Sequence, residues 1–168
     1  VDRNSVFDES SGFTAAYHFT VDENFVADRM LAIAEHPELC MLRVNGEDVS
    51  WLPERNSLDH HLGTADIRRY VLPGENLLEV VVPRFHVLME LDAIYLQGDF
   101  SVRERDGKWI LSSPEPLQYG PWNAQGLPFY PYAVQYAYEV ALEHKPETAK
   151  LDVTDYHASV ISVAVNDK

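Results

Sequence analysis

The 168-residue sequence predicts an all-β fold of the sandwich or barrel type. Three observations support this. In many short segments apolar residues recur at every second position, the period of a strand with one buried face. Gly, Pro and Asn interrupt these segments at short intervals, as turns do. Helical periodicity is weak throughout, and its best window, residues 23–34, fits a turn followed by a strand equally well.

The expected strands can be placed from this alternation. In the first, residues 15–21, Ala15, Tyr17, Phe19 and Val21 share one face. Residues 30–34 and 40–44 follow, and Asn45-Gly46 then predicts a hairpin because both residue types tolerate positive φ. Residues 67–72 fit a short strand or a helical turn, and Pro73-Gly74 predicts a turn. Further strands are expected at residues 77–82, 93–102 (interrupted at Gly98-Asp99), 109–111, 134–142, 150–153 and 160–165.

Composition and charge disfavour some classes of partner and indicate how the fold is held together. A net charge of −14 and a pI of about 4.7 disfavour nucleic acid and membrane surfaces as partners. Cys40 is the one cysteine, so no intrachain disulfide can form, and its apolar neighbours predict that it is buried. No apolar stretch approaches the roughly 20 residues that span a bilayer. The chain begins with Val1 rather than Met, which suggests a processed start or a domain boundary.

An internal repeat is visible in the strand pattern. Tyr17 and Asn45 are 28 residues apart, as are Tyr138 and Asn166. Between them, residues 31–33 match residues 151–153 and residues 40–44 match 161–165, with a one-residue shift in the intervening loop. Repeats on this scale indicate a supersecondary unit used twice. We therefore expect one sandwich at residues 1–104 and the start of a second, possibly incomplete one at 105–168; the alternative is one sandwich with extra strands.

Two motifs resemble a known family. They are the run from Leu42 to Glu47, which contains Val-Asn-Gly, and the run from Ala65 to Val82, which contains Asp-Ile and Pro-Gly-x-Asn. Both resemble the galactose-binding-domain-like jelly rolls of family 2 glycosidases and of α-L-rhamnosidase-like glycoside hydrolases. Residues 94–102 and 125–130 look like further stretches of the large bacterial proteins of that kind. The second Val-Asn element departs from the pattern, because Asp167 stands where the family has Gly.

The resemblance implies an all-β jelly-roll sandwich that accompanies a separate catalytic domain. On this interpretation the chain is a non-catalytic accessory domain of a bacterial glycoside hydrolase, structural in role and possibly carbohydrate-binding. A periplasmic or secreted location is expected. The expected partners are carbohydrate and the catalytic domain of the same parent chain, and no cofactor is expected apart from a structural calcium ion. Within the motifs, Gly46 and Gly74 would supply unusual backbone conformations, Asp66 would cap a turn and Asn76 would bond its own backbone.

Sugar-binding candidates come from the loops that carry aromatic and amide side chains. An aromatic ring packs on the apolar C–H face of a pyranose, while polar groups fix its hydroxyls. The proline-rich segment 114–131 contains several such rings and is expected to be an ordered loop. Trp109, Phe129 and Tyr130 fit packing onto the sandwich or onto a neighbouring domain better than binding. The candidate carbohydrate-binding residues are Trp51, Arg55, Asn56, Tyr119, Trp122, Asn123 and Gln125.

Metal and catalytic candidates are weaker. The Asp59-His60-His61 run offers ligand types but has no third ligand at a recognisable spacing, so an exposed polar loop is the better interpretation. Asp2, Asp8 and Glu9 are the candidate donors for a structural calcium ion. The 27 Asp and Glu residues make carboxylate pairs, such as Glu90 and Asp92, common, so no catalytic residue is assigned.

Two other hypotheses remain open. A purely structural module that docks a catalytic domain would expose an apolar patch at about residues 121–132. A small sandwich-fold hydrolase would need two facing carboxylates in a cleft, one of them with a perturbed pKa. The nucleotide-binding, zinc-protease and nucleophile-elbow motifs are absent from the sequence, which disfavours those chemistries.

Overall fold

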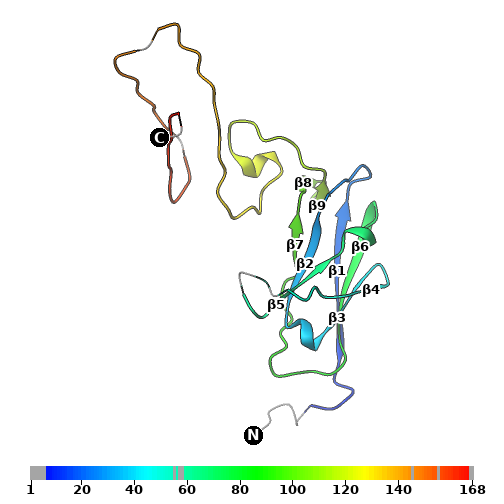
Figure 1. Cartoon of the computed structure of the whole chain (residues 1–168). Helices are drawn as coiled ribbons and strands as arrows, with labels where there is room; N and C mark the ends of the chain where they lie inside the picture. Colours follow the sequence, from blue (N-terminus) through cyan, green and yellow to red (C-terminus); the bar gives the residue numbers. More distant parts are fainter. Residues whose placement is uncertain (1–6, 55, 57–58, 145, 155, 167–168) are drawn as a thin grey trace. The chain divides into compact units, whose positions relative to one another are not determined.

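The computed structural model describes residues 7–54, 56, 59–144, 146–154 and 156–166. The chain divides into two compact units, residues 1–134 and 135–168. The first contains two β-sheets that enclose one core, so the all-β sandwich that the sequence predicts is confirmed (Figure 1).

The larger sheet has six strands in the order β4-β3-β6-β1-β9-β8. Neighbouring strands run antiparallel except for β1 and β9, which are parallel. The centre of this sheet therefore joins the first strand of the chain to a strand formed much later. The strands are β1 (Phe13–Val21), β3 (Met41–Val44), β4 (Glu47–Val49), β6 (Gly74–Val82), β8 (Ser101–Arg105) and β9 (Lys108–Ser112).

The smaller sheet has three antiparallel strands in the order β5-β2-β7. Its central strand β2 (Met30–Glu35) is buried at five of six positions, whereas β5 (Leu62–Asp66) and β7 (Tyr95–Gly98) lie at the edges. A strand covered on both faces is apolar throughout, which is why β2 shows no alternation. The described residues also contain the short 3₁₀ helices η2 (Pro37–Leu39), η3 (Arg68–Tyr70) and η4 (Trp122–Gln125).

The core lies between the sheets and follows the predicted alternation. Leu78, Val80 and Val82 of β6 are each at most 5% exposed, and the residues between them are half-buried. Burial of this apolar surface is the main favourable term in folding. Cys40 is also buried, as expected, and its neighbour Met41 points outward.

The two family-like motifs meet at one buried amide. Asn76 is 1% exposed, and its Oδ1 accepts the Leu72 N–H at 2.8 Å and the Asn45 Nδ2–H at 2.8 Å. Its own Nδ2 donates to the carbonyls of Leu72 and Gly74 at 2.7 and 3.0 Å. Buried amides need their donors and acceptors satisfied, and here each atom has two partners. The expected bonding of Asn76 to its own backbone is confirmed.

Asn45 connects β3 to the start of β6. It has the left-handed φ of 53° that the predicted turn requires, and Gly46 follows at 86°. Its Nδ2 also donates to the Tyr70 carbonyl at 2.9 Å, and its Oδ1 accepts the Leu77 N–H at 2.9 Å. The pair Asn45–Asn76 therefore fixes the register of β3 on β6.

The expected boundary after residue 104 falls inside the β8–β9 hairpin. Arg105 pairs with Lys108 across this hairpin, and β9 pairs with β1 of the same sheet. Residues 105–112 are thus strands of the first sandwich, and the division between compact units lies after Val134 instead. Whether residues 135–168 belong to a second module remains a prediction.

The strands expected at residues 134–142, 150–153 and 160–165 are not formed. The described residues of this unit contain no strand, and apolar side chains such as Val140 (76% exposed) and Val160 (82% exposed) face solvent. A strand needs a neighbour for its backbone hydrogen bonds, and periodicity alone does not supply one.

Candidate functional site

Five exposed aromatic side chains stand out in the first unit. They are Trp109 (48% exposed), Tyr119 (74%), Phe129 (65%), Tyr130 (40%) and Tyr132 (52%), and we call them the aromatic surface. One comes from strand β9 and four come from the loop that follows it. Large apolar rings exposed in one short stretch of a chain are a common mark of a binding surface.

The loop that carries these rings is anchored to strand β8. The Gly126 carbonyl accepts the Val102 N–H at 2.7 Å, and Gly126 has a φ of 92°. A Cβ at this position would lie 2.7 Å from the Cβ of Ser101, so only glycine fits between loop and strand. Because Ser101 is itself buried, the contact holds the loop firmly.

A single amide braces the turn between the prolines. The Oε1 of Gln125 accepts the Gln118 N–H at 2.7 Å, and its Nε2 donates to the carbonyls of Gln118 and Pro121. The η4 helix then ends at Gly126, whose N–H donates to the Trp122 carbonyl. The proline-rich segment is therefore an ordered loop over its described length, although it has little regular structure.

Four of the five rings contact edge-to-face, in two pairs. The centroids of Trp109 and Phe129 are 5.0 Å apart with an interplanar angle of 71°, and those of Tyr130 and Tyr132 are 5.7 Å apart at 67°. This geometry suits the quadrupoles of the rings and leaves outer faces exposed. Trp109 and Phe129 thus pack the loop onto β9, as the sequence suggested, and they remain about half exposed while doing so.

Four of the seven predicted sugar-binding residues lie in this loop. Tyr119 is exposed, Trp122 is half-buried, Asn123 accepts the Ala124 N–H with its side chain, and Gln125 braces the turn. Three rings of the aromatic surface, Trp109, Phe129 and Tyr130, were assigned mainly to packing by the sequence. A ring that is exposed at a strand end or in an irregular loop follows no regular period. The sequence therefore could not indicate that these three rings are exposed.

The other predicted sugar-binding residues lie between β4 and β5. Trp51 packs against the core and its Nε1–H donates to the Cys40 carbonyl at 3.1 Å. Asn56 is half-buried and its Nδ2 lies 3.4 Å from the Thr64 hydroxyl. Arg55 lies outside the described residues. The indole of Trp51 therefore has a structural hydrogen bond to the backbone of the sandwich.

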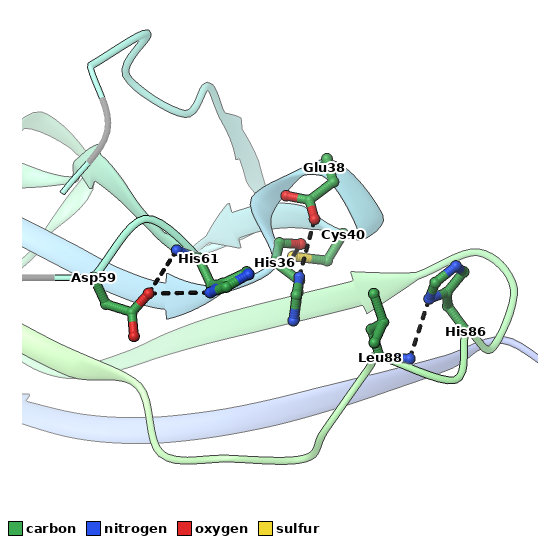
Figure 2. A network of polar contacts seen from close by, with 7 residues as sticks. All are labelled: His36, Glu38, Cys40, Asp59, His61, His86 and Leu88. Atoms are coloured by element: carbon green, nitrogen blue, oxygen red, sulfur yellow. Dashed lines mark hydrogen bonds and ion pairs between the residues drawn. The ribbon is translucent and has the colours of Figure 1, made fainter.

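A group of polar side chains surrounds the turn after β2 (Figure 2). The His36 Nδ1 lies 3.0 Å from a Glu38 carboxylate oxygen, and the His61 Nδ1 lies 3.1 Å from Asp59. The imidazoles of His36 and His61 are 5.3 Å apart, and the His36 N–H donates to the His61 carbonyl.

The contacts drawn within this group are local. His36 pairs with Glu38, and Asp59 with His61, each over two residues, as in polar turns (Figure 2). Among the residues that the structure describes, no group of three or more His, Cys, Asp and Glu side chains is arranged to hold a metal ion. The interpretation of residues 59–61 as a polar loop fits these contacts.

The calcium candidates lie at the start of the described chain. Asp8 accepts the Ser10 N–H at 2.8 Å and the Ser10 hydroxyl at 2.7 Å, and these bonds, the backbone bond first, lower its pKa. Its carboxylate is thus engaged in an Asx turn. Glu9 is exposed, and Asp2 lies outside the described residues. The structural calcium ion stays a prediction.

Two hollows on the described surface are small. One of about 20 Å³ lies beside Tyr17, Met89 and Ala93, and one of about 160 Å³ lies beside Phe25, Arg68 and Val71. Pockets that enclose small molecules typically occupy about 300–1,000 Å³. An open surface is therefore the stronger candidate for binding.

The described part of the chain has no helix that could cross a bilayer.

Comparison of the chain with protein-family models, with curated proteins and with solved structures gives no match.

Proposed function

We propose that this chain is a non-catalytic accessory β-sandwich of the jelly-roll, galactose-binding-like kind, which belongs to a bacterial glycoside hydrolase and contacts carbohydrate through the aromatic surface. The Val-Asn-Gly and Pro-Gly-x-Asn motifs support this family, since their two Asn residues bond to one another in the fold. The proposal places the parent protein in the periplasm or outside the cell.

The observation that carries the proposal is the set of exposed rings anchored by Gly126. An aromatic face packs well on the C–H face of a sugar ring, and a platform that is already ordered loses little entropy on binding. Trp109 and Phe129 contact each other at a ring distance of 5.0 Å, so their relative orientation is fixed before any ligand arrives. The small hollows favour an extended polysaccharide over an enclosed monosaccharide.

Two exposed carboxyl groups, those of Asp8 and Asp59, lack the raised pKa of a general acid. A glycosidase needs a general acid whose pKa is raised. Hydrogen bonds instead lower the pKa of Asp59, mainly the one from the His61 N–H, as they lower that of Asp8. Both groups are exposed and are held as anions by their local turns.

Affinity electrophoresis and tryptophan fluorescence with a panel of polysaccharides and oligosaccharides, including rhamnose- and galactose-containing ones, test the proposal. We expect at least one ligand to retard the wild-type chain. Phe129→Ala should weaken that binding by about fivefold, because a stacking ring contributes about 1 kcal/mol. Tyr95→Ala is the matched control: this ring is 56% exposed on β7, outside the aromatic surface.

Failure of every ligand to bind would refute the carbohydrate half of the proposal, as would equal weakening by the two variants. A change in far-ultraviolet circular dichroism would show that a variant had lost its fold instead. Since Phe129 lies in a loop, the sandwich should survive its truncation.

A second candidate function is docking to the catalytic domain of the same parent protein. The inward hydrogen bonds of Gln125 favour it, because they occupy an amide that would otherwise orient sugar hydroxyls. On this hypothesis the aromatic surface should bind a hydrophobic dye, and Phe129→Ser with Tyr132→Ser should lower the amount bound to the level that the exposed apolar side chains of the second unit retain. A wild-type chain that binds no dye and stays monomeric at high concentration would count against it.

A further inference from the structure

The first three strands of the sandwich do not pair with one another. Strand β1 lies between β6 and β9, β2 lies between β5 and β7, and β3 lies between β4 and β6. Residues 13–44 therefore supply much of the core, but all their ladder hydrogen bonds go to strands that come later in the chain. Strand β6 is the shared neighbour of β1 and β3.

The second unit repeats the apolar pattern of these three strands at a constant spacing. When the apolar residues of the second unit are aligned with the buried residues of β2, no shift in the intervening loop is needed. Leu151 and Val153 then correspond to Met30 and Ala32, which are both 0% exposed. Each counterpart stands 121 positions later, as Asn166 does after Asn45. The counterparts of Tyr17, Phe19, Val21, Met30, Ala32, Cys40, Leu42 and Val44 are Tyr138, Val140, Leu142, Leu151, Val153, Ile161, Val163 and Val165.

Burial separates the two copies sharply. Leu42 and Val44 are 1% and 0% exposed, whereas their counterparts Val163 and Val165 are 54% and 65% exposed. The second copy thus has the apolar residues of a core, but its described residues contain no strand that covers them. This accounts for the absence of strands from its described residues, since the corresponding strands of the first unit also depend on later ones.

The backbone at the end of the repeat supplies a second observation. Asn166 has a φ of 51°, and Asn45 has a φ of 53°. Few residues other than glycine adopt this conformation. In the first unit it places the Asn45 amide against Asn76 and the Leu77 N–H, so that β3 is fixed to β6. Asn166 therefore has the same turn conformation as Asn45. The described residues of the second unit contain no strand equivalent to β6 with which its amide could bond.

We propose that residues 134–166 are the β1–β2–β3 portion of a second sandwich and that they fold on a strand of the β6 type, which begins with Pro-Gly-x-Asn and continues with alternating apolar residues. That strand pairs antiparallel with the counterparts of β1 and β3, and its Asn receives the amide of Asn166. In the first unit β6 comes from further along the same polypeptide, and the proposal assigns the same source here.

The test appends a second copy of residues 46–112 directly after Asn166, which supplies β4 to β9 in the order of the first unit. In the unmodified chain we expect amides 138–142 and 161–165 to exchange hydrogen within seconds to minutes. In the extended chain they should be slowed at least 100-fold. Continued fast exchange there, while the amides of the first unit stay protected, would overturn the proposal.

Two neighbouring residues give a matched control. Val163 corresponds to buried Leu42, and Ser162 corresponds to Met41, which is 45% exposed. In the extended chain, Val163→Asp should abolish the new protection and Ser162→Asp should retain it. If the two variants behave alike, the register is wrong and the proposal falls with it, whatever the aromatic surface binds. Neither variant touches the first unit's core, so protection there reports that the chain is otherwise folded.

Discussion

The side chain of Asn76 connects the turn that precedes it to the side chain of Asn45. Its amide bonds to Leu72, to Gly74 and to Asn45, and it is almost wholly excluded from solvent. The local bonds are predictable from Pro-Gly-x-Asn, because turn residues bond their own backbone. The bond to Asn45 joins residues 31 apart, so no local pattern could have indicated it.

Replacing Asn76 with alanine should be among the most damaging single changes in the sandwich. Asn76→Ala removes the acceptor of the Leu72 N–H and of one Asn45 N–H, together with the donor to the Leu72 and Gly74 carbonyls, which costs about 2–4 kcal/mol of unfolding free energy. Urea unfolding followed by tryptophan fluorescence measures it. Asn123→Ala, in the exposed loop, should change the same quantity by less than about 0.5 kcal/mol. Equal losses of unfolding free energy in the two variants would show that the buried hydrogen bonds of Asn76 stabilise the fold no more than the exposed side chain of Asn123 does.

The thiol of Cys40 makes stability depend on alkaline pH. Burial, and secondarily the charge of Glu38, raises its pKa to about 11, from an ordinary value near 9. A raised pKa means that the folded state holds the proton more tightly. The contribution of the protonated Cys40 thiol to the unfolding free energy is therefore complete below pH 9, and it is lost as the pH rises through about 11.

Unfolding free energy measured between pH 8.5 and 11 checks this expectation. The wild-type chain should lose about 1–3 kcal/mol more than Cys40→Ala over that range, since one pKa unit corresponds to about 1.4 kcal/mol. The variant controls for the tyrosines and lysines that titrate in the same range. Parallel curves for the two proteins would show that the thiol is not the cause.

At the scale of elements, strand period and turn residues predicted most of the sandwich. Strands β1, β3 and β6 have clear alternation, and the expected break at Gly98-Asp99 is real: β7 and β8 on its two sides belong to different sheets. Strand β5 was missed because Leu62–Asp66 holds small residues that carry little periodic signal. Gly63 is needed there, since a Cβ would lie 2.5 Å from the ring of Pro37.

The aromatic loop should be separable from the sandwich by one substitution. In Gly126→Ala the new Cβ would collide with Ser101 and the φ of 92° would be strained, so the loop should detach from β8. We expect faster hydrogen exchange at the Val102 amide, whose acceptor is the Gly126 carbonyl, and weaker binding of any carbohydrate ligand.

Strand amides in β3 and β6 should stay protected in the same variant, because β1 and β9 lie between these strands and β8 in the sheet. Asn123→Ala serves as the control within the loop and should leave the exchange at Val102 unchanged. Loss of protection throughout the sandwich in Gly126→Ala would contradict the view that the loop is a separate unit of stability.

At the scale of the molecule, the sandwich should be independent of the second unit. A chain that ends at Val134 keeps both sheets and the aromatic surface, so its unfolding free energy should equal that of the full chain within about 0.5 kcal/mol. A chain that ends at Asp106 removes β9 and the buried Leu111, and it should be far less stable. Stability that changes on removal of residues 135–168 alone would contradict this division.

The fold class was predictable from the sequence, but the partition of the chain was not. A boundary after residue 104 seemed natural because a new run of strands begins there. Strand β9 instead returns to the first strand of the chain, and such long-range pairing leaves no local trace. In the site, the loop was identified by its prolines and rings, whereas the exposure of Trp109 depends on tertiary packing.

The place of β1 between β6 and β9 has a consequence for synthesis on the ribosome. The first strand to emerge has no neighbour until residues 74–82 have been translated, which takes several seconds at about 5–20 residues per second. Through that interval an aromatic, β-prone segment is held as a nascent chain with open edges. Chaperones that bind extended apolar polypeptide should therefore engage Phe13–Val21 while the rest of the sandwich is being translated, and slowing translation after β3 should increase aggregation.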